Sequence, residues 1–506
     1  MHEREDKSKS KNPSFDDLFC RDLPTKPLPF LGRILVTGAS GYIGGRLIPE
    51  LIARGYRVRA MVRGTASVYK KMWPDIEVVV ADALLPGTLE KALEGIDTAF
   101  YLIHSLHLGP KEFEAADIKA AANFRHAAEE KRIRRIIYLG GLGDISSHLS
   151  SHLRNRMEVA EELRQGAVPV TILRAAIIIG SGSASYEIIE HLVRRLVFIP
   201  VPRWGQNNCQ PISIRDVIKY MVGVLEIPES VGLSFSIGGK EILTYKEMLG
   251  IFSEILNKRT IYFNCPISSI RFYAYLASQV TPVPNAITQC LMEGLKDKVI
   301  CEDMVIKSIL PFQPVSYRQA LINAMTREQQ DRVSTRWSDA FPPAHELALK
   351  LHELKGKEKY NAEFTIFSEK PANSVFNSIC RIGGKEGWLY NTWMWRLRGV
   401  VDRLLTGVGT SRGRKSYSSL QINDVIDFWR IEDIKPNRRL LLRSEMKTLR
   451  RAWLEFSVKE RGGRRKVTLR AYYDPMSIMG KLYWYVILPF HNLIFKNLLL
   501  EIDKKS

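Results

Sequence analysis

The chain has 506 residues, of which 45% are hydrophobic and 25% charged, so it is long enough for two or three domains and too apolar to be wholly disordered. Its net charge of +20 at pH 7 suggests an anionic partner, although a soluble basic surface explains the charge equally well. The six cysteines form no CxxC pair, which argues against a zinc site or a disulfide framework and favours a reducing, cytoplasmic location.

Residues 1–30 are rich in charged residues, serine and proline and contain no apolar signal core, so we expect a disordered tail there. From residue 31 to residue 255, strand-like apolar runs alternate with amphipathic helical patterns. This rhythm predicts an α/β domain with a doubly wound parallel sheet. The expected strands are 33–37, 56–62, 76–81, 98–103, 135–139 and 170–173, and the expected helices are 43–53, 87–93, 113–130 and 155–164.

A helical connecting region, 256–355, follows and is expected to pack on the first domain and close a substrate cleft. The last part, 356–506, predicts an α+β domain in which an antiparallel sheet wraps around a long C-terminal helix and encloses an apolar cavity. Its expected strands are 360–368, 424–431, 438–447, 452–459 and 466–473, and its expected helices are 373–379, 388–405 and 477–500. Residues 482–500 are long enough to span a bilayer, but Pro489, His491 and Lys496 favour a buried or interfacial amphipathic helix.

The most informative motif is a glycine-rich turn between the first strand and the first helix. Gly38, Gly41 and Gly44 have the spacing and context of a Rossmann turn, in which glycines permit close approach of a pyrophosphate to the amides of a helix N-terminus. An ordinary glycine turn is the alternative. The residues expected to hold the cofactor here are Thr37, Gly38, Ala39, Ser40, Gly41, Tyr42, Ile43 and Gly44.

Arg63 stands at the end of the second strand, where an NAD site usually has an acidic residue for the ribose hydroxyl. An arginine there can pair with a 2′-phosphate, and Arg59 adds positive charge, so NADP is favoured over NAD. A solvent-facing arginine is the alternative. Asp82 and Ala83 follow the third strand, where Asp82 could accept a hydrogen bond from adenine or cap the next helix.

The TGASGYIG turn, Asp82, the strand end 101–104, the strand 171–174 and the run 211–217 together resemble the atypical and extended short-chain dehydrogenase/reductases. Proteins related to NAD-dependent epimerases and NmrA-like proteins are most similar. The resemblance implies that the cofactor also touches the loops near Leu102 and Gly140, with the loop 180–183 near the nicotinamide. Residues 360–500 resemble an uncharacterised domain often fused behind such a reductase-like domain, and their order of elements is similar to the START-like, helix-grip fold.

Members of that superfamily use a tyrosine with a lysine four residues later, and no tyrosine in this chain has one. His152 and Arg156 stand at the matching place, and the usual serine is replaced by Gly140 and Gly141. In one interpretation His152 supplies the proton and Arg156 orients the ribose. In the other, the pair is a remnant and the domain binds cofactor without turnover.

Other candidate sites are weaker. His104 and His107 lack a third ligand for a metal, so no metal site is expected. Tyr186 could donate a proton or simply pack. The basic runs 412–415 and 461–466 suggest solvated loops more than a specific nucleic-acid site, and the tryptophans of the C-terminal part suggest core with some rings facing a pocket.

These patterns favour an NADP-dependent oxidoreductase or epimerase-like enzyme acting on a bulky apolar substrate that the C-terminal domain binds, delivers or shields. A redox-sensing regulator or scaffold without catalysis is the alternative, as in NmrA-like proteins. A weaker alternative makes the basic C-terminal domain a lipid-binding or peripheral membrane module, with a membrane-associated fraction of an otherwise cytoplasmic protein.

Overall fold

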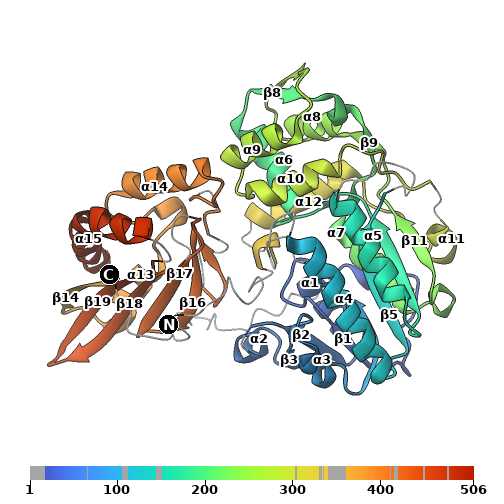
Figure 1. Cartoon of the computed structure of the whole chain (residues 1–506), viewed down its shortest axis with the longest axis horizontal. Helices are drawn as coiled ribbons and strands as arrows, with labels where there is room; N and C mark the ends of the chain where they lie inside the picture. The colour runs from blue at the N-terminus through green and yellow to red at the C-terminus, as the bar shows by residue number, and fades with distance from the viewer. Residues whose placement is uncertain are drawn as a thin grey trace, which may run out of the picture.

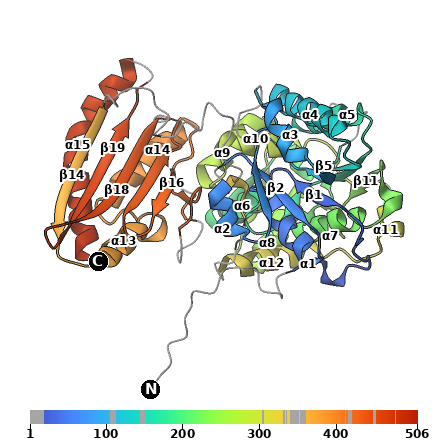
Figure 2. The same cartoon turned by 90° about the horizontal axis from the view of Figure 1, so that it is seen from below.

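The computed structural model describes residues 18–64, 66–104, 112–143, 151–302, 305–329, 333, 335–339, 351, 360–410, 412–414, 420–447, 451–475 and 478–506. Two bodies lie side by side, the first built on a parallel sheet and the second on an antiparallel sheet (Figures 1 and 2). The predicted α/β domain followed by an α+β domain is therefore confirmed.

The first sheet has seven strands, all parallel, in the order β11-β6-β5-β4-β1-β2-β3. The chain reverses its direction across the sheet between β1 and β4, and ligands of doubly wound sheets bind outside the carboxyl ends of the strands at such a point. The elements are β1 (Arg33–Val36), α1 (Gly44–Ala53), β2 (Val58–Val62), α2 (Ala66–Met72), β3 (Glu77–Val80), α3 (Pro86–Leu93), β4 (Ile96–Tyr101), α4 (Glu112–Glu130), β5 (Arg135–Gly141), α5 (Ser151–Arg164), β6 (Val170–Ala175), α7 (Ile214–Leu225) and β11 (Ser234–Ile237).

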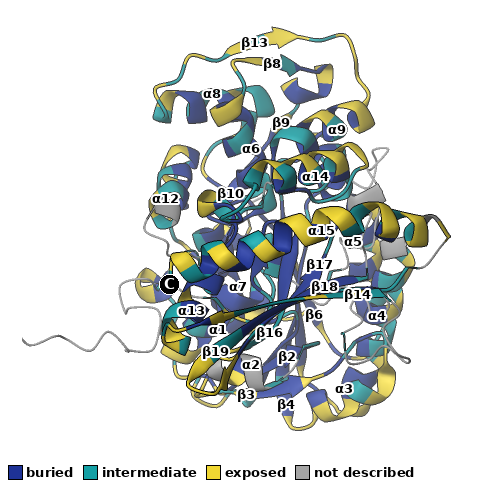
Figure 3. Cartoon of the chain, turned by 90° about the vertical axis from the view of Figure 1, so that its left-hand side faces the viewer, coloured by how far each residue is buried: buried dark blue, intermediate teal, exposed yellow. Residues whose placement is uncertain are grey.

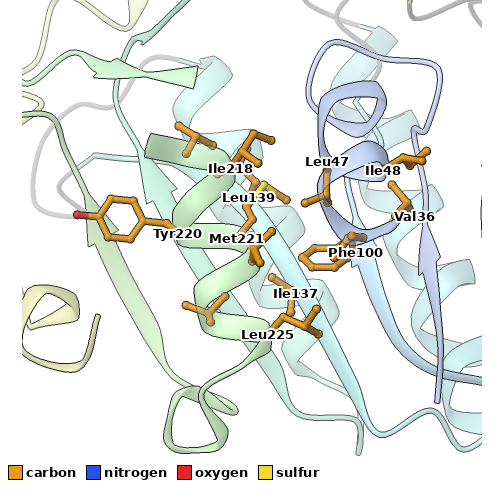
Figure 4. Packing of buried hydrophobic residues seen from close by; sticks show 14 of the residues in the cluster. Val36, Leu47, Ile48, Phe100, Ile137, Leu139, Ile218, Tyr220, Met221 and Leu225 are labelled. Carbon is orange, nitrogen blue, oxygen red and sulfur yellow. The ribbon is translucent and has the colours of Figure 1, made fainter. Parts of the chain in front are cut away.

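Helices cover both faces of this sheet because its central strands are apolar on both sides. On one face, side chains of α1 and α7 interlock with those of β1, β4 and β5, as Figure 4 shows for Leu47, Phe100, Ile137 and Met221. On the other face, α3, α4 and α5 bury a second cluster that contains Leu35, Tyr101 and Phe124. The six predicted strands are present, whereas α2, α7 and β11 have no counterpart among the elements expected from the sequence.

A third hydrophobic cluster joins the helical connecting region to the carboxyl edge of the sheet. It is built by α6 (Ala184–Arg195), α8 (Tyr245–Ile255), α9 (Ile270–Val280), α10 (Asn285–Glu293) and α12 (Tyr317–Gln329). Short strands β7 (Ile178–Ile179), β8 (Phe198–Val201), β9 (Asn208–Cys209), β10 (Ile212–Ser213), β12 (Leu243–Thr244) and β13 (Ile261–Asn264) link these helices, and a one-turn helix, α11 (Ile306–Ile309), lies beside β11.

Part of the expected disordered tail is ordered. Phe19, Cys20 and Leu23 are buried against the first domain. The backbone amides of Phe19 and Cys20 donate to the buried carboxylate of Glu50, with N–O distances of 2.6 and 3.1 Å, and Asp22 forms an ion pair with Lys219. Composition alone could not reveal these partners, because they lie on α1 and α7. Residues 1–17 lie outside the described part.

The second domain is a six-stranded antiparallel sheet in the order β14-β19-β18-β17-β16-β15. Its strands are β14 (Tyr360–Ser368), β15 (Val425–Ile426), β16 (Trp429–Lys435), β17 (Arg439–Ser444), β18 (Ala452–Arg461) and β19 (Arg464–Tyr473). The helices α13 (Ala372–Cys380), α14 (Thr392–Leu404) and α15 (Ile478–Lys504) pack on one face (Figure 1). The single strand expected over 424–431 is wrong, because Asp427 has φ of 55° and turns the chain between β15 and β16.

Most tryptophans of this domain form core, whereas Trp393 on α14 is exposed. The ring centroids of Trp388 and Trp395 lie 4.1 Å apart and stacked, and both rings contact Phe428. The indole N–H of Trp388 donates to Asp427 at 2.8 Å, which satisfies the polar atom inside the core. The predicted helix over 388–405 starts only at Thr392, since Leu389 and Asn391 adopt positive φ.

A buried ion-pair network contradicts the expectation that the basic run 412–415 is a solvated loop. Glu445 pairs with Arg412 and Arg430, each at 2.6 Å, and Arg443 lies 3.6 Å away. Burial alone would raise the pKa of Glu445, but the guanidiniums of Arg430 and Arg412 outweigh it and hold the pKa well below its usual range. Arg414 is also buried and donates to carbonyls of 380 and 382. The run 461–466 does form an exposed hairpin turn.

Replacing Glu445 by Gln should lower the free energy of unfolding of the second domain by about 3–5 kcal/mol, because it leaves buried guanidiniums without their counter-charge. The pKa of Glu445 is lower in the folded state, so its contribution is present above pH 4.5, the ordinary pKa, and is lost as pH falls toward the folded value. Urea titration of the Glu445→Gln variant at pH 7 measures the loss. The control is Glu460→Gln on the exposed hairpin, which should change stability by less than about 0.5 kcal/mol.

Candidate cofactor and substrate cleft

A cavity of about 370 Å³ opens at the carboxyl edge of the parallel sheet, at the reversal point between β1 and β4. Its lining runs from the glycine-rich turn through the ends of β2, β3, β4 and β5 into the helical connecting region. Eleven of the thirteen predicted cofactor residues take part in this lining, together with Arg156; the eleven are Gly38, Ser40, Gly41, Tyr42, Ile43, Gly44, Arg63, Asp82, Ala83, Leu102 and Gly140.

The two predicted cofactor residues that do not line the cavity are Thr37 and Ala39. Thr37 lies beneath the turn, where its hydroxyl donates to the carbonyl of Phe100 at 3.1 Å and accepts from the amide of Leu102 at 2.9 Å. Ala39 is fully buried. Neither residue lines the cavity, and their contact with a cofactor stays a prediction.

The glycine-rich turn has no room for side chains at Gly38 and Gly44. Gly38 has φ of 58°, and a Cβ there would lie 2.5 Å from the carbonyl oxygen of Leu102. A Cβ on Gly44 would lie 2.5 Å from the carbonyl oxygen of Gly38. The helix α1 begins at Gly44 with no side chain capping its N-terminus, so the positive end of the helix dipole faces the cavity. The turn therefore fits a pyrophosphate.

Arg63 and Asp82 lie at the nucleotide end of the cavity, as predicted. Within the described part of the chain, no carboxylate comes within ion-pair distance of Arg63. Burial lowers the pKa of its guanidinium, and the negative charge of Asp82 partly opposes that lowering. One oxygen of Asp82 accepts from the amide of Leu84 at 3.0 Å, so Asp82 stabilises its own loop and does not cap α3.

Arg59 does not contribute to the cavity, which corrects the expectation that it adds charge near Arg63. Its side chain is buried at the opposite end of β2, where it pairs with Glu77 at 2.9 Å. It also donates to the carbonyls of Ala92 and Glu94 at the end of α3. Since residues 59 and 63 are separated by nearly the whole length of β2, they act on different edges of the sheet.

A buried polar group lies deeper in the cavity. His104, just after β4, and Arg156, on α5, both line it. The Nδ1 atom of His104 lies 2.8 Å from a carboxylate oxygen of Asp117 on α4. Burial lowers the pKa of His104, Arg156 lowers it further, and the hydrogen bond with Asp117 opposes both. Arg156 donates to the carbonyl of Leu139 at 3.2 Å and covers the ring of Tyr138.

His152, the predicted proton donor, begins α5 one turn before Arg156, but its side chain lies outside the described residues. His107 lies outside them too. Among the described residues, no group of three histidines, cysteines or carboxylates could hold a metal ion. From the sequence, His104 was considered only as a possible metal ligand. Its contact with Asp117 could not be predicted, because Asp117 is 13 positions away on another element.

The far half of the cavity is apolar and comes from α6, α8 and the connecting region. Its walls include Ile188, Ile189, Tyr245, Leu291, Met292, Leu295 and Val299. No described residue of the second domain belongs to the lining, so the position of the cavity does not support the expectation that this domain holds the substrate. Ser183 of the loop 180–183 reaches the cavity, whereas Tyr186 is fully buried in the core against Phe252.

A short segment around Thr335 closes one side of the cleft and was not foreseen from the sequence. The buried guanidinium of Arg46 on α1 hydrogen-bonds the carbonyl and hydroxyl of Thr335 and the carbonyl of Ser181. Trp337 lines the cavity, and its indole N–H donates to Glu187 at 2.7 Å. These contacts hold residues 335–337 beside the glycine-rich turn, so that Trp337 forms part of the cavity wall.

Comparison with known proteins places this cleft in a family. The NmrA-like family model matches residues 31–293, and the model described as a protein of unknown function (DUF2867) matches residues 357–498. The mitochondrial NADH dehydrogenase [ubiquinone] 1 alpha subcomplex subunit 9 of Arabidopsis thaliana is 24% identical over 343 residues, which cover 65% of this chain and 76% of that protein. The photosystem II assembly factor Ycf39 of Trieres chinensis is 20% identical over 250 residues, 49% of this chain and 75% of the relative.

Solved structures and further relatives match parts of the chain at low identity or low coverage. The triphenylmethane reductase of Citrobacter sp. complexed with NADP(H) is 18% identical, with a TM-score of 0.49, and the match covers 57% of this chain and 99% of that one. A 4-hydroxy-2-methyl-3-oxo-4-farnesyl-3,4-dihydroquinoline-1-oxide ketoreductase of Stigmatella aurantiaca is 30% identical, but over only 21% of this chain and 33% of its own. The NmrA-like family model covers more than half of this chain, so the chain belongs to the NmrA-like family. A DUF2867 domain follows the matched part.

Proposed function

We propose that the protein is an NADP-dependent oxidoreductase that acts on a bulky apolar substrate bound in the far half of the cleft. The observation that carries this proposal is the continuity of one cavity, which joins the glycine-rich turn to a wall of aliphatic side chains past His104 and Arg156. A cofactor that bound without a substrate would not need the apolar half. The nicotinamide supplies hydride chemistry when bound.

Arg63 supports NADP over NAD. It lies at the end of β2, where the adenosine ribose of a Rossmann cofactor is held, and no described carboxylate neutralises it. A guanidinium in a half-buried setting binds a phosphate more strongly than a hydroxyl, because charge-assisted hydrogen bonds are stronger than neutral ones.

The proton that accompanies hydride transfer is assigned to His104. Its imidazole lines the cavity, and the carboxylate of Asp117 at 2.8 Å fixes the ring orientation. Because burial and Arg156 depress its pKa, the imidazole is neutral at pH 7 and can accept a proton from a substrate hydroxyl or return one to a carbonyl. His152 remains the alternative donor that the sequence suggests.

A second candidate function is a redox-sensing scaffold without turnover. It is favoured by the absence of the usual tyrosine and lysine pair and by two relatives, one named as an assembly factor and the other as a subunit of NADH dehydrogenase. In this case NADPH and NADP would change the affinity for a protein partner, and His104 would serve only to pack the site.

Replacing Arg63 by Ala should weaken NADPH binding by about 10- to 100-fold, because the 2′-phosphate loses a charged partner, and should leave NADH binding nearly unchanged. Isothermal titration with both cofactors measures the two effects. The control is Arg57→Ala, which removes an exposed arginine at the other end of the same strand. Equal losses for NADPH and NADH would show that Arg63 does not read the 2′-phosphate.

Replacing His104 by Gln should lower kcat by about 100-fold or more while leaving the Kd for NADPH within a factor of about three, since general acid–base catalysis contributes that much. The assay follows NADPH oxidation with a panel of bulky apolar ketones and aldehydes, and NADP reduction with the matching alcohols. Because the neutral form of His104 accepts the proton, alcohol oxidation should fall as pH drops through its pKa, which lies below 6.5.

The control for that variant is His126→Gln, an exposed histidine on α4. Unchanged kcat in His104→Gln would remove the proton role from this residue and return it to His152. No turnover by the native protein with any substrate of the panel, together with tight NADPH binding, would favour the scaffold.

A further inference from the structure

The outer faces of α14 and α15 carry an unusual density of exposed apolar side chains. On α14, Trp393, Leu397, Val400, Val401 and Leu404 recur every three or four residues, which puts them on one face of the helix, and the exposed Leu405 follows directly after it. The same spacing repeats on α15 with Ile478, Leu482, Tyr485, Val486, Phe490, Leu493 and Leu500. Close to half of the exposed large apolar side chains in the described part of the chain lie on these two helices.

The opposite faces of the two helices hold them firmly in the second domain. Trp395 of α14 packs against Phe495 of α15, with ring centroids 6.2 Å apart, and both belong to the core. Figure 1 shows the two helices over the same face of the sheet, and Figure 3 shows exposed residues along both. The apolar stripes are therefore the outer surface of a packed layer and not a face that another part of the described chain covers.

Cations accompany the stripes and carboxylates are nearly absent from them. Arg396 on α14 and Lys481 and Lys496 on α15 are exposed among the apolar residues. The one acidic residue of α14, Asp402, is buried, and α15 has none before Glu501. The helix α9 of the first domain, joined to α14 through Arg403 and Gln279, adds the exposed residues Arg271, Phe272 and Leu276.

We propose that this surface, formed by α14 and α15 and extended by α9, docks the protein on an anionic lipid bilayer. Apolar stripes with basic residues along them are what an interfacial helix needs, because the side chains enter the acyl boundary while the cations meet the headgroups. Long basic side chains such as Lys496 can reach the headgroup layer from within the stripe. This proposal is independent of the proposed redox activity.

The surface lies on the bilayer and does not cross it. The segment Gly480–Lys504 is long and apolar enough to span a membrane, but a third of its most apolar window, 33%, is buried inside the second domain. Removing it from the sheet would expose the core residues Phe495, Leu498 and Leu499. A second copy of the chain is disfavoured as the occupant, since like charges such as Arg396 and Lys481 would face one another.

Trp393 provides a direct test, because it is the one exposed tryptophan among the nine, all of which the structure describes. The full chain is mixed with vesicles of phosphatidylcholine and phosphatidylglycerol, or of phosphatidylcholine alone, and binding is measured by flotation. Vesicles with brominated acyl chains should quench the fluorescence of the bound protein. Trp393→Phe should bind equally well and lose most of that quenching.

The double variant Leu397→Glu/Leu404→Glu should lower the partition coefficient on anionic vesicles by more than about tenfold. Its matched control, Leu233→Glu/Val305→Glu, adds the same charge at equally exposed apolar positions elsewhere and should lose much less. Equal losses in the two variants, no quenching of Trp393, or equal binding to neutral vesicles would overturn the proposal. A lipid-free dimer that only Leu397→Glu/Leu404→Glu dissociates, seen by light scattering, would assign the surface to a second copy instead.

Discussion

The close approach of two backbone segments at the end of β1 determines how the first domain can work. The carbonyl oxygen of Leu102 lies only 2.5 Å from where a Cβ on Gly38 would be, and the carbonyl oxygen of Gly38 lies 2.5 Å from where a Cβ on Gly44 would be. With glycine at both positions, α1 can start directly above the ends of β1 and β4. The position of α1 then sets Arg46, which in turn holds Thr335 against the cleft. The shape of the cavity therefore depends on glycine at positions 38 and 44.

Much of the first domain was predictable because its signals are local. Parallel strands buried on both faces appear as apolar runs, and the glycine turn, Arg63 and Asp82 each follow directly after such a run. Among the missed elements, α2 is only seven residues long and β11 is a four-residue edge strand, so their signals are weak. The 12-residue helix α7 is different, because its amphipathic pattern is strong enough to have been predicted. The pair His104 and Asp117 and the contact of Arg46 with Thr335 depend on segments that meet only in the folded chain.

In the second domain the alternation of apolar and polar residues predicted the long strands correctly. Composition, however, could not distinguish a buried charge from a solvated one. Arg412 and Arg414 look like a surface cluster in the sequence, yet Glu445 and backbone carbonyls neutralise or satisfy them inside the domain. Conversely, the apolar run of α15 suggests burial, although one side of the helix faces outward. Amphipathic spacing identifies a helix with two unlike faces, and only the fold shows which face is covered.

The two domains meet at the nucleotide end of the cleft, through polar side chains that a sequence pattern does not mark. The hydroxyl of Tyr69 on α2 accepts from Asn423 of the second domain at 3.1 Å and is also hydrogen-bonded to Ser40 in the glycine-rich turn. Because Ser40 lines the cavity, the second domain supports the turn through a single intervening ring. A domain that contributes no residue to the cleft can therefore still influence it, and its apolar helices stay free to face outward.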